Sequence, residues 1–102
     1  MDTLEAIAEP ARRRILDALL DGERLVGDLG AELGIAQPSV SKHLAVLRGA
    51  GLVRVRPDAQ RRWYSLDPAP LRDVDEWLAP YRRRWADALD ALERHLDEQE
   101  QT

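Results

Sequence analysis

Five side chains that can form hydrogen bonds lie close together near the middle of the chain: Gln37, Ser39, Ser41, Lys42 and His43. An amide pairs with an adenine edge, whereas hydroxyl, ammonium and imidazole groups reach base or phosphate atoms. The major groove of DNA admits one helix whose exposed face offers such short donors and acceptors. The pattern predicts a surface that reads DNA, and an ordinary solvated helix face is the alternative.

A second group with DNA-binding chemistry follows a turn predicted at 57–60. Arg61 and Arg62 lie just after this turn, where guanidinium groups reach backbone phosphates or enter the minor groove. Arg54 and Arg56 lie on the strand before it and extend the positive charge, although charged residues also protect the edges of sheets. We expect DNA contacts from Arg61 and Arg62, and both explanations stay open for Arg54 and Arg56.

Positive charge is concentrated in one third of an acidic chain. The formal net charge is −4 over 102 residues, yet residues 37–66 hold six cations against one carboxylate. Residues 1–36 hold four cations against eight carboxylates, and residues 67–102 hold five against ten. Local sign decides where a polyanion binds, so the acidic total does not argue against a nucleic-acid partner.

Composition excludes several classes of protein and site. The chain has no cysteine, which excludes disulfides, thiolate metal sites and thiol catalysis. No apolar run approaches the ~20 residues of a membrane span, and the first residues do not resemble a secretory signal, so we expect a cytoplasmic protein without a membrane partner. Two histidines, no glycine-rich phosphate loop and no isolated carboxylate pair argue against an enzyme.

Hydrophobic spacing predicts helices at 10–20, 26–33 and 38–49, the second ending at a glycine turn at Gly34, and a short segment at 3–8 precedes them. A helix, a short glycine turn and a second helix form a helix-turn-helix. Alternating residues then predict a β-hairpin at 52–66, in which Trp63 and Tyr64 serve packing. The expected fold is mainly α with a small β-hairpin, a winged helix-turn-helix.

A long amphipathic helix is expected at 69–98, which would span ~45 Å. Pro80 predicts a kink or a helix in two pieces near Trp77. The apolar stripe is too long for a core of this size to cover, so part of it is expected to contact a second subunit, at Trp85, Leu89, Leu92 and Leu96. Two-fold symmetry would then place two recognition helices ~34 Å apart.

Four stretches carry a resemblance to a known family: 8–16 (AEPARRRIL), 35–44 (IAQPSVSKHL), 47–53 (LRGAGLV) and 61–66 (RRWYSL). Over about residues 4–98 the chain resembles regulators of the ArsR family. The resemblance implies a homodimeric bacterial repressor that binds double-stranded operator DNA through Gln37, Ser39, Ser41, Lys42 and His43. It also implies a dimer interface on the outer helices, which adds Leu4 and Ile7 to the four residues of the last helix.

Two departures from the family pattern concern helix starts and sensing. Leu25 and Ala36 stand where family members often place a Ser or Thr N-cap, so we expect Gln37 or Asp28 to compensate in part. The zinc pattern of the family's last helix is incomplete, because His95 and Glu98 match its second half while Arg82 and Arg84 occupy its first half. Two ligands are too few for zinc. We expect no metal and no other cofactor, and the effector is unknown.

The resulting hypothesis is one domain over 1–102 that represses transcription by occluding a promoter at a palindromic operator. Its parts are a helix-turn-helix at about 26–49, a wing at about 52–66 and a dimerisation helix at about 69–98. The alternative is a winged-helix module that binds another protein and dimerises through a coiled-coil-like last helix. The arginine clusters at 12–14 and 82–84 are expected to be solvated or ion-paired.

Overall fold

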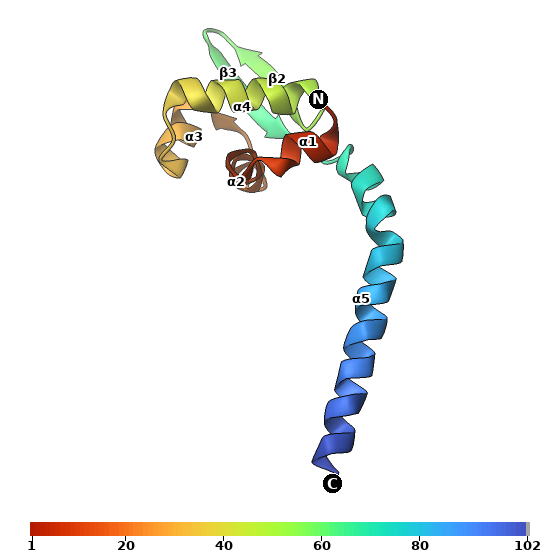
Figure 1. Cartoon of the computed structure of the whole chain (residues 1–102). Helices are drawn as coiled ribbons and strands as arrows, with labels where there is room; N and C mark the ends of the chain where they lie inside the picture. Colours follow the sequence, from red (N-terminus) through yellow and green to blue (C-terminus); the bar gives the residue numbers. More distant parts are fainter. Residues whose placement is uncertain (102) are drawn as a thin grey trace. The chain divides into compact units, whose positions relative to one another are not determined.

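The computed structural model describes residues 1–101 (Figure 1). Its elements in chain order are α1 (Thr3–Ala8), α2 (Pro10–Leu19), β1 (Arg24–Leu25), α3 (Val26–Leu33), α4 (Gln37–Gly49), β2 (Val53–Asp58), β3 (Arg61–Leu66) and α5 (Leu71–Glu100). Residues 1–72 form one compact unit, and the chain from residue 73 onward forms a second. The predicted winged helix-turn-helix with a long last helix is confirmed. Within residues 1–101, no helix combines the length and apolar character needed to cross a bilayer.

Side-chain caps and one proline divide the first two helices. The Asp2 carboxylate accepts a hydrogen bond from the Glu5 amide at 2.8 Å and caps α1. Glu9 has an extended backbone, as expected before a proline, and it ends α1 and begins α2. Pro10 then occupies the first turn of α2, where no amide hydrogen is needed.

Glycines shape the turn between α3 and α4. Gly34 adopts the left-handed conformation with φ of 68°, and a Cβ on Gly30 would lie 2.8 Å from the Ile35 carbonyl oxygen. Leu25 and Ala36 provide no side-chain cap, and the side chains of Gln37 and Asp28 form no hydrogen bond that replaces one. The partial compensation expected from Gln37 or Asp28 is therefore not a hydrogen bond; Asp28 lies in the first turn of α3, where its charge complements the helix dipole.

The sheet has three antiparallel strands in the order β1-β3-β2, so the prediction of a two-stranded hairpin missed β1. Val53 pairs with Leu66 at one end of the wing and Asp58 pairs with Arg61 at the other. Only residues 59–60 form the turn, shorter than predicted, because β2 continues through Pro57. A proline is tolerated there because β2 is an edge strand.

The core of residues 1–72 joins the apolar faces of the helices to the base of the wing. Its buried members are Ala6, Ile15, Leu16, Ala18, Leu19, Leu29, Val40, Leu44, Leu47, Leu52 and Val53. Tyr64, Leu66 and Leu71 are half-buried and pack against this cluster. The predicted apolar stripes of α2, α3 and α4 thus meet in one core that holds α4 in place.

The last helix, α5, is one continuous helix that includes Pro80, so the expectation of a helix in two pieces is wrong, while the alternative of a kink near Trp77 stays a prediction. Proline removes one amide donor, which leaves the carbonyl of Glu76 without its helical partner. Both Glu76 and Pro80 are exposed, so water can satisfy that carbonyl without ending the helix. None of the described residues of α5 is buried within the single chain.

Candidate nucleic-acid interface

Burial of one side of α4 turns its polar side outward. Val40, Leu44 and Leu47 are completely buried, and they fix the rotation of the helix about its axis. The five polar residues predicted from the sequence therefore lie outside the core: Gln37, Ser39, Ser41 and Lys42 are exposed, and His43 is half-buried. Their side chains form no hydrogen bond or ion pair within residues 1–101, so all five can bind an external partner.

The alternation of β3 separates the two arginines of the wing. Arg62, Tyr64 and Leu66 lie at every second position and share one side of the strand. Tyr64 and Leu66 pack against the core on that side, whereas Arg61 follows the other side with Trp63. Both arginines are exposed, and neither forms a hydrogen bond or an ion pair within residues 1–101.

A hollow joins the polar side of α4 to the wing. Its lining residues are Ser41, Leu44, Ala45, Arg48, Gly49, Arg62 and Tyr64, and we call it the α4–wing hollow. A second hollow at the wing tip is lined by Arg48, Val55, Pro57, Ala59, Gln60, Arg61 and Arg62. The structure thus brings Ser41 of α4 and Arg62 of β3 to one surface.

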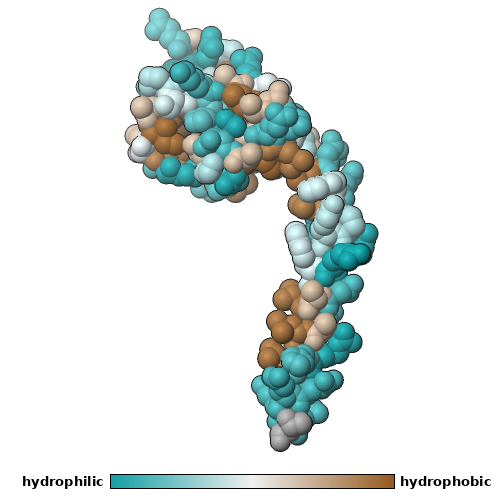
Figure 2. All heavy atoms as spheres, in the orientation of Figure 1, coloured by the Kyte–Doolittle hydropathy of each residue, from teal (hydrophilic) through white to brown (hydrophobic). Residues whose placement is uncertain are grey.

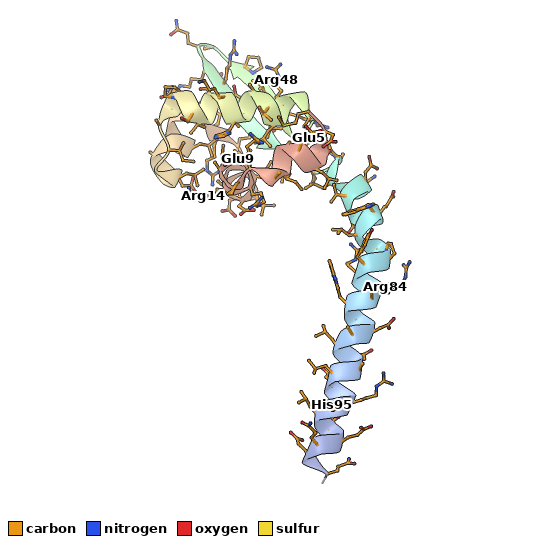
Figure 3. All side chains as sticks on the ribbon, viewed as in Figure 1. Glu5, Glu9, Arg14, Arg48, Arg84 and His95 are labelled. Carbon is orange, nitrogen blue, oxygen red and sulfur yellow. The ribbon has the colours of Figure 1, made fainter. Side chains whose placement is uncertain are left out.

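Arg48 lines both hollows, and the sequence-based site residues did not include it (Figure 3). It lies in the last turn of α4, is exposed and forms no side-chain bond within residues 1–101. Its position seven residues after Ser41 is the signal that could have found it, because that spacing returns to the same side of a helix.

Two other arginines of the basic segment are held by carboxylates. Arg54 lies 3.0 Å from Asp67, and Arg56 donates to both oxygens of Glu23 at 3.1 and 3.2 Å. The hydrogen bond to Glu23 raises the pKa of Arg56, whose guanidinium also lies 5.8 Å from the centre of the Trp63 ring. Arg54 and Arg56 thus have carboxylate partners within the chain.

Asp67 is held by more than its arginine partner. The Ala69 amide donates to its carboxylate at 3.1 Å and is the main reason that the pKa of Asp67 is lowered; desolvation opposes this shift, and the Arg54 hydrogen bond adds a smaller lowering. Among the residues of segment 37–66, the cations left without a carboxylate are Lys42, Arg48, Arg61 and Arg62. All four lie on α4 or at the wing tip.

Comparison with known proteins identifies relatives that regulate transcription. Residues 9–55 match the family described as "Bacterial regulatory protein, arsR family". The chain is 39% identical over 93 residues to the HTH-type transcriptional regulator Rv2034 of Mycobacterium tuberculosis, covering 91% of this chain and 84% of that protein. It is 35% identical over 77 residues to the transcriptional repressor SdpR of Bacillus subtilis, covering 76% of this chain and 86% of SdpR.

The chain belongs to the ArsR family. A solved structure described as a possible transcriptional regulator for arsenical resistance is similar to this ArsR-family protein with a TM-score of 0.70 and 41% identity, covering 90% of this chain and 93% of that one. Reduced HlyU from Vibrio cholerae is similar with a TM-score of 0.63 and 40% identity, covering 76% and 82%. The resemblance noted in the sequence is confirmed. These relatives are transcriptional regulators, so this ArsR-family chain is a DNA-binding regulator and not an enzyme.

The residues predicted for a dimer interface divide into an exposed and a packed group. Leu4 in α1 and Trp85, Leu89, Leu92 and Leu96 in α5 are exposed apolar side chains of this ArsR-family chain. Ile7 is half-buried and already packs against the core of residues 1–72. Figure 2 shows apolar side chains gathered along part of α5.

The arginine cluster at 12–14 has a role that the sequence did not reveal. Arg12 donates to the Ala6 carbonyl at 2.6 Å and Arg13 to the Ile7 carbonyl at 2.6 Å, both near the end of α1. The last carbonyls of a helix lack helical donors and carry partial negative charge, which explains these contacts. Arg13 and Arg14 are exposed to solvent, as expected, but the hydrogen bonds of this cluster to helix carbonyls were not predicted.

Arg14 makes the equivalent contact to the helix-turn-helix: its Nη2 donates to the carbonyl of Leu33, the last residue of α3, at 2.7 Å (Figure 3). Arg14 therefore ties α2 to the residue just before the Gly34 turn.

In the second arginine cluster, at 82–84, Arg82 pairs with Asp75 at 2.7 Å, as expected.

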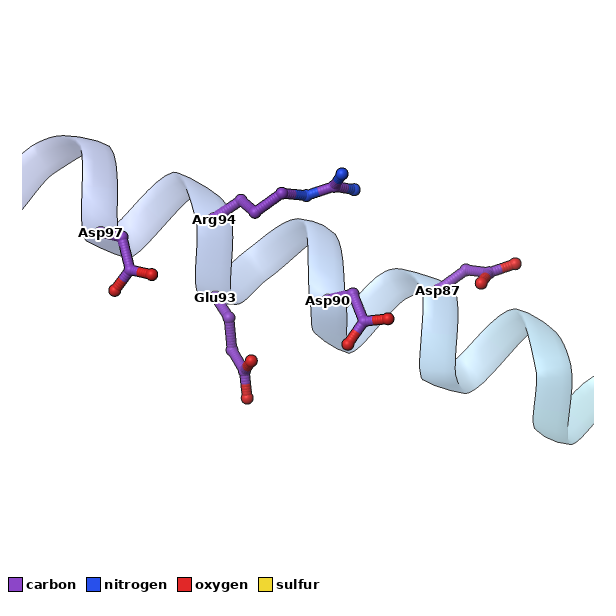
Figure 4. A pocket seen from close by; sticks show the side chains of 5 residues that line it. All are labelled: Asp87, Asp90, Glu93, Arg94 and Asp97. Carbon is purple, nitrogen blue, oxygen red and sulfur yellow. The ribbon is translucent and has the colours of Figure 1, made fainter.

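The residues of the incomplete zinc pattern do not form a metal site within residues 1–101. His95 Nε2 lies 3.2 Å from the Gln99 side-chain nitrogen. No group of three or more histidine, aspartate or glutamate side chains in that part of the chain is arranged to hold a metal ion. Figure 4 shows Asp87, Asp90, Glu93, Arg94 and Asp97 extending from α5 on a predominantly acidic side.

Proposed function

We propose that this chain is a homodimeric, sequence-specific repressor that binds a palindromic operator and blocks the promoter, without sensing a metal. One observation carries the proposal. Within residues 1–72, the unpaired cations of the basic segment and the free polar groups of α4 share one surface, while the other two arginines of that segment have carboxylate partners.

The proposed contacts fall into two kinds. Gln37, Ser39, Ser41, Lys42 and His43 enter the major groove on α4, where amide, hydroxyl and imidazole groups distinguish base edges. Arg61 and Arg62 bind the backbone or the adjacent minor groove from the wing. Phosphate contacts supply affinity that falls with salt, and base contacts supply the choice of sequence.

The proposed dimer follows from the surface of α5. Trp77, Tyr81, Trp85, Leu89, Leu92 and Leu96 repeat every three or four residues and are each 45–61% exposed in the single chain. At ~100° per residue, Asp87, Asp90, Arg94 and Asp97 lie on the opposite side. A continuous apolar stripe backed by charged residues is typical of a helix that packs against another subunit.

Repression by occlusion requires only that the dimer occupies the promoter. The relatives include a repressor, SdpR, and an activator, HlyU of Vibrio cholerae, which is 41% identical over 75 residues. The proposal of regulation without a metal is supported by the absence of cysteine and by arginine at positions 82 and 84.

Occlusion is tested by the order of addition in transcription in vitro. Adding the protein before RNA polymerase should block transcription, and adding it afterwards should not. Stimulation of transcription would contradict occlusion.

The test of DNA binding is selection of bound fragments from genomic DNA, followed by footprinting. We expect a protected palindrome whose half-site centres are about one helical turn apart. Ser41→Ala with Lys42→Ala should abolish protection, whereas Arg83→Gln on the polar side of α5 should leave it unchanged. Absence of any protected site, or full protection by the Ser41/Lys42 variant, would refute the proposal.

A further inference from the structure

We propose that Arg48 and Arg62 together bind a single backbone phosphate of DNA in the α4–wing hollow. The inference rests on the proposed DNA-binding function and gives it a specific phosphate site. It assigns a role to Arg48, and it separates the roles of the adjacent residues Arg61 and Arg62.

Geometry brings the two arginines to the same hollow from different elements. Arg48 lies in the last turn of α4, and Arg62 lies on the side of β3 that also carries Tyr64. Both line the α4–wing hollow, whereas Arg61 lines only the hollow at the wing tip. A phosphate between α4 and the wing would thus meet one guanidinium from each.

Charge pairing leaves these two side chains available. The lining of the α4–wing hollow contains no carboxylate. The nearby carboxylates Glu23 and Asp67 are engaged by Arg56 and Arg54, and Asp58 accepts a hydrogen bond from the Trp63 indole at 3.4 Å. Guanidinium groups present planar, paired donors that match phosphate oxygens, so two of them can hold one phosphate from two directions.

Two small residues, Ala45 and Gly49, line the hollow one helical turn apart. A Cβ on Gly49 would meet no atom within 4 Å, and Gly49 is not among the glycines with positive φ. The fold therefore does not require glycine at this position, although alanine would favour the helix. The packing of the chain does not explain the glycine at position 49, whereas close approach of a ligand backbone to the hollow would explain it.

The experiment compares the salt dependence of binding to a random-sequence duplex for Arg48→Gln, Arg62→Gln and the double variant. Each phosphate neutralised contributes about 0.9 to the slope of log K against log salt. If both arginines share one phosphate per protomer, each single variant keeps the slope, since one guanidinium remains. The double variant then loses about 1.8 per dimer and binds about a hundredfold more weakly at low salt.

Arg54→Gln is the matched control, because it removes one exposed positive charge from the same segment but at a residue already paired with Asp67. Its slope should equal that of the wild type. Arg48 and Arg62 form no side-chain bond within residues 1–101, so thermal unfolding of their variants should also match the wild type.

The outcomes are separable. A loss of about 1.8 in each single variant and about 3.6 in the double would show separate phosphates, and an unchanged slope in the double variant would show no contact; either refutes the shared site. If wild-type protein bound no duplex, the proposed function would fail as well. Inorganic phosphate is the second probe, at constant ionic strength. Displacement of DNA from the wild type but not from the double variant would support the site, because phosphate would compete there with the DNA backbone, whereas equal displacement from both would refute it.

Discussion

The contact between Arg14 and the end of α3 predicts a measurable contribution to stability. Arg14 Nη2 donates to the Leu33 carbonyl at 2.7 Å, at the negative end of the α3 dipole. A hydrogen bond to a charged group contributes about 1.5–3 kcal/mol and a cation at a helix C-terminus about 0.3–1 kcal/mol. Arg14 is exposed, so solvent screening reduces both. We expect Arg14→Gln to lower the free energy of unfolding by about 1–2 kcal/mol.

Urea unfolding followed by circular dichroism, at one fixed protein concentration, measures this change. The midpoint should fall without a change in the m-value, and the melting temperature should drop by about 4–8 °C per kcal/mol. Arg83→Gln, on the exposed polar side of α5, is the control and should leave the midpoint unchanged. Equal midpoints for Arg14→Gln and Arg83→Gln would refute the reasoning that this carbonyl contact stabilises the helix-turn-helix.

Three further predictions follow from other elements. Ala59 has a φ of 55° in the wing turn, so Ala59→Gly should raise the free energy of unfolding by about 0.5–1 kcal/mol; a lower value would contradict the strain. The folded pKa of Asp67 lies below its unfolded value, so its stabilisation is present above about pH 4 and is lost as pH falls through the folded pKa. Asp67→Asn should therefore be less sensitive to acid than the wild type in unfolding experiments between pH 7 and pH 3, and equal sensitivity would exclude this role. If the chain forms the proposed dimer, Leu92→Glu should turn it into monomers in analytical ultracentrifugation, and a persistent dimer would place the interface elsewhere.

The sequence predicted the helices of the DNA-binding unit well, because their signals are local. Gly34 and the apolar stripe of α3 define a helix at 26–33, and the structure has the same boundaries. Local signals failed where length or context decides. β1 has only two residues, too few for a period, and Pro57 suggested a turn where an edge strand tolerates it.

The candidate site was predicted in part, because residue type reveals chemistry but not the partner. The five polar residues of α4 follow from helical spacing alone. Arg56 pairs with a carboxylate 33 positions earlier, and Arg14 with a carbonyl 19 positions later, which no local pattern indicates. Arg48 was not among the predicted residues because the hollow that it lines is completed by the wing, which the spacing along α4 does not reveal.

The most direct test of the central claim, that unpaired cations on α4 and the wing grip duplex DNA, is the salt slope of wild-type binding to a genomic fragment. If Lys42 and Arg61 each bind one phosphate and Arg48 and Arg62 share another, a dimer neutralises six phosphates, and the slope should be about −5. Affinity should then fall about a thousandfold between roughly 50 and 200 mM salt. A slope near zero, or binding that fails to distinguish DNA from an unrelated polyanion, would contradict the account.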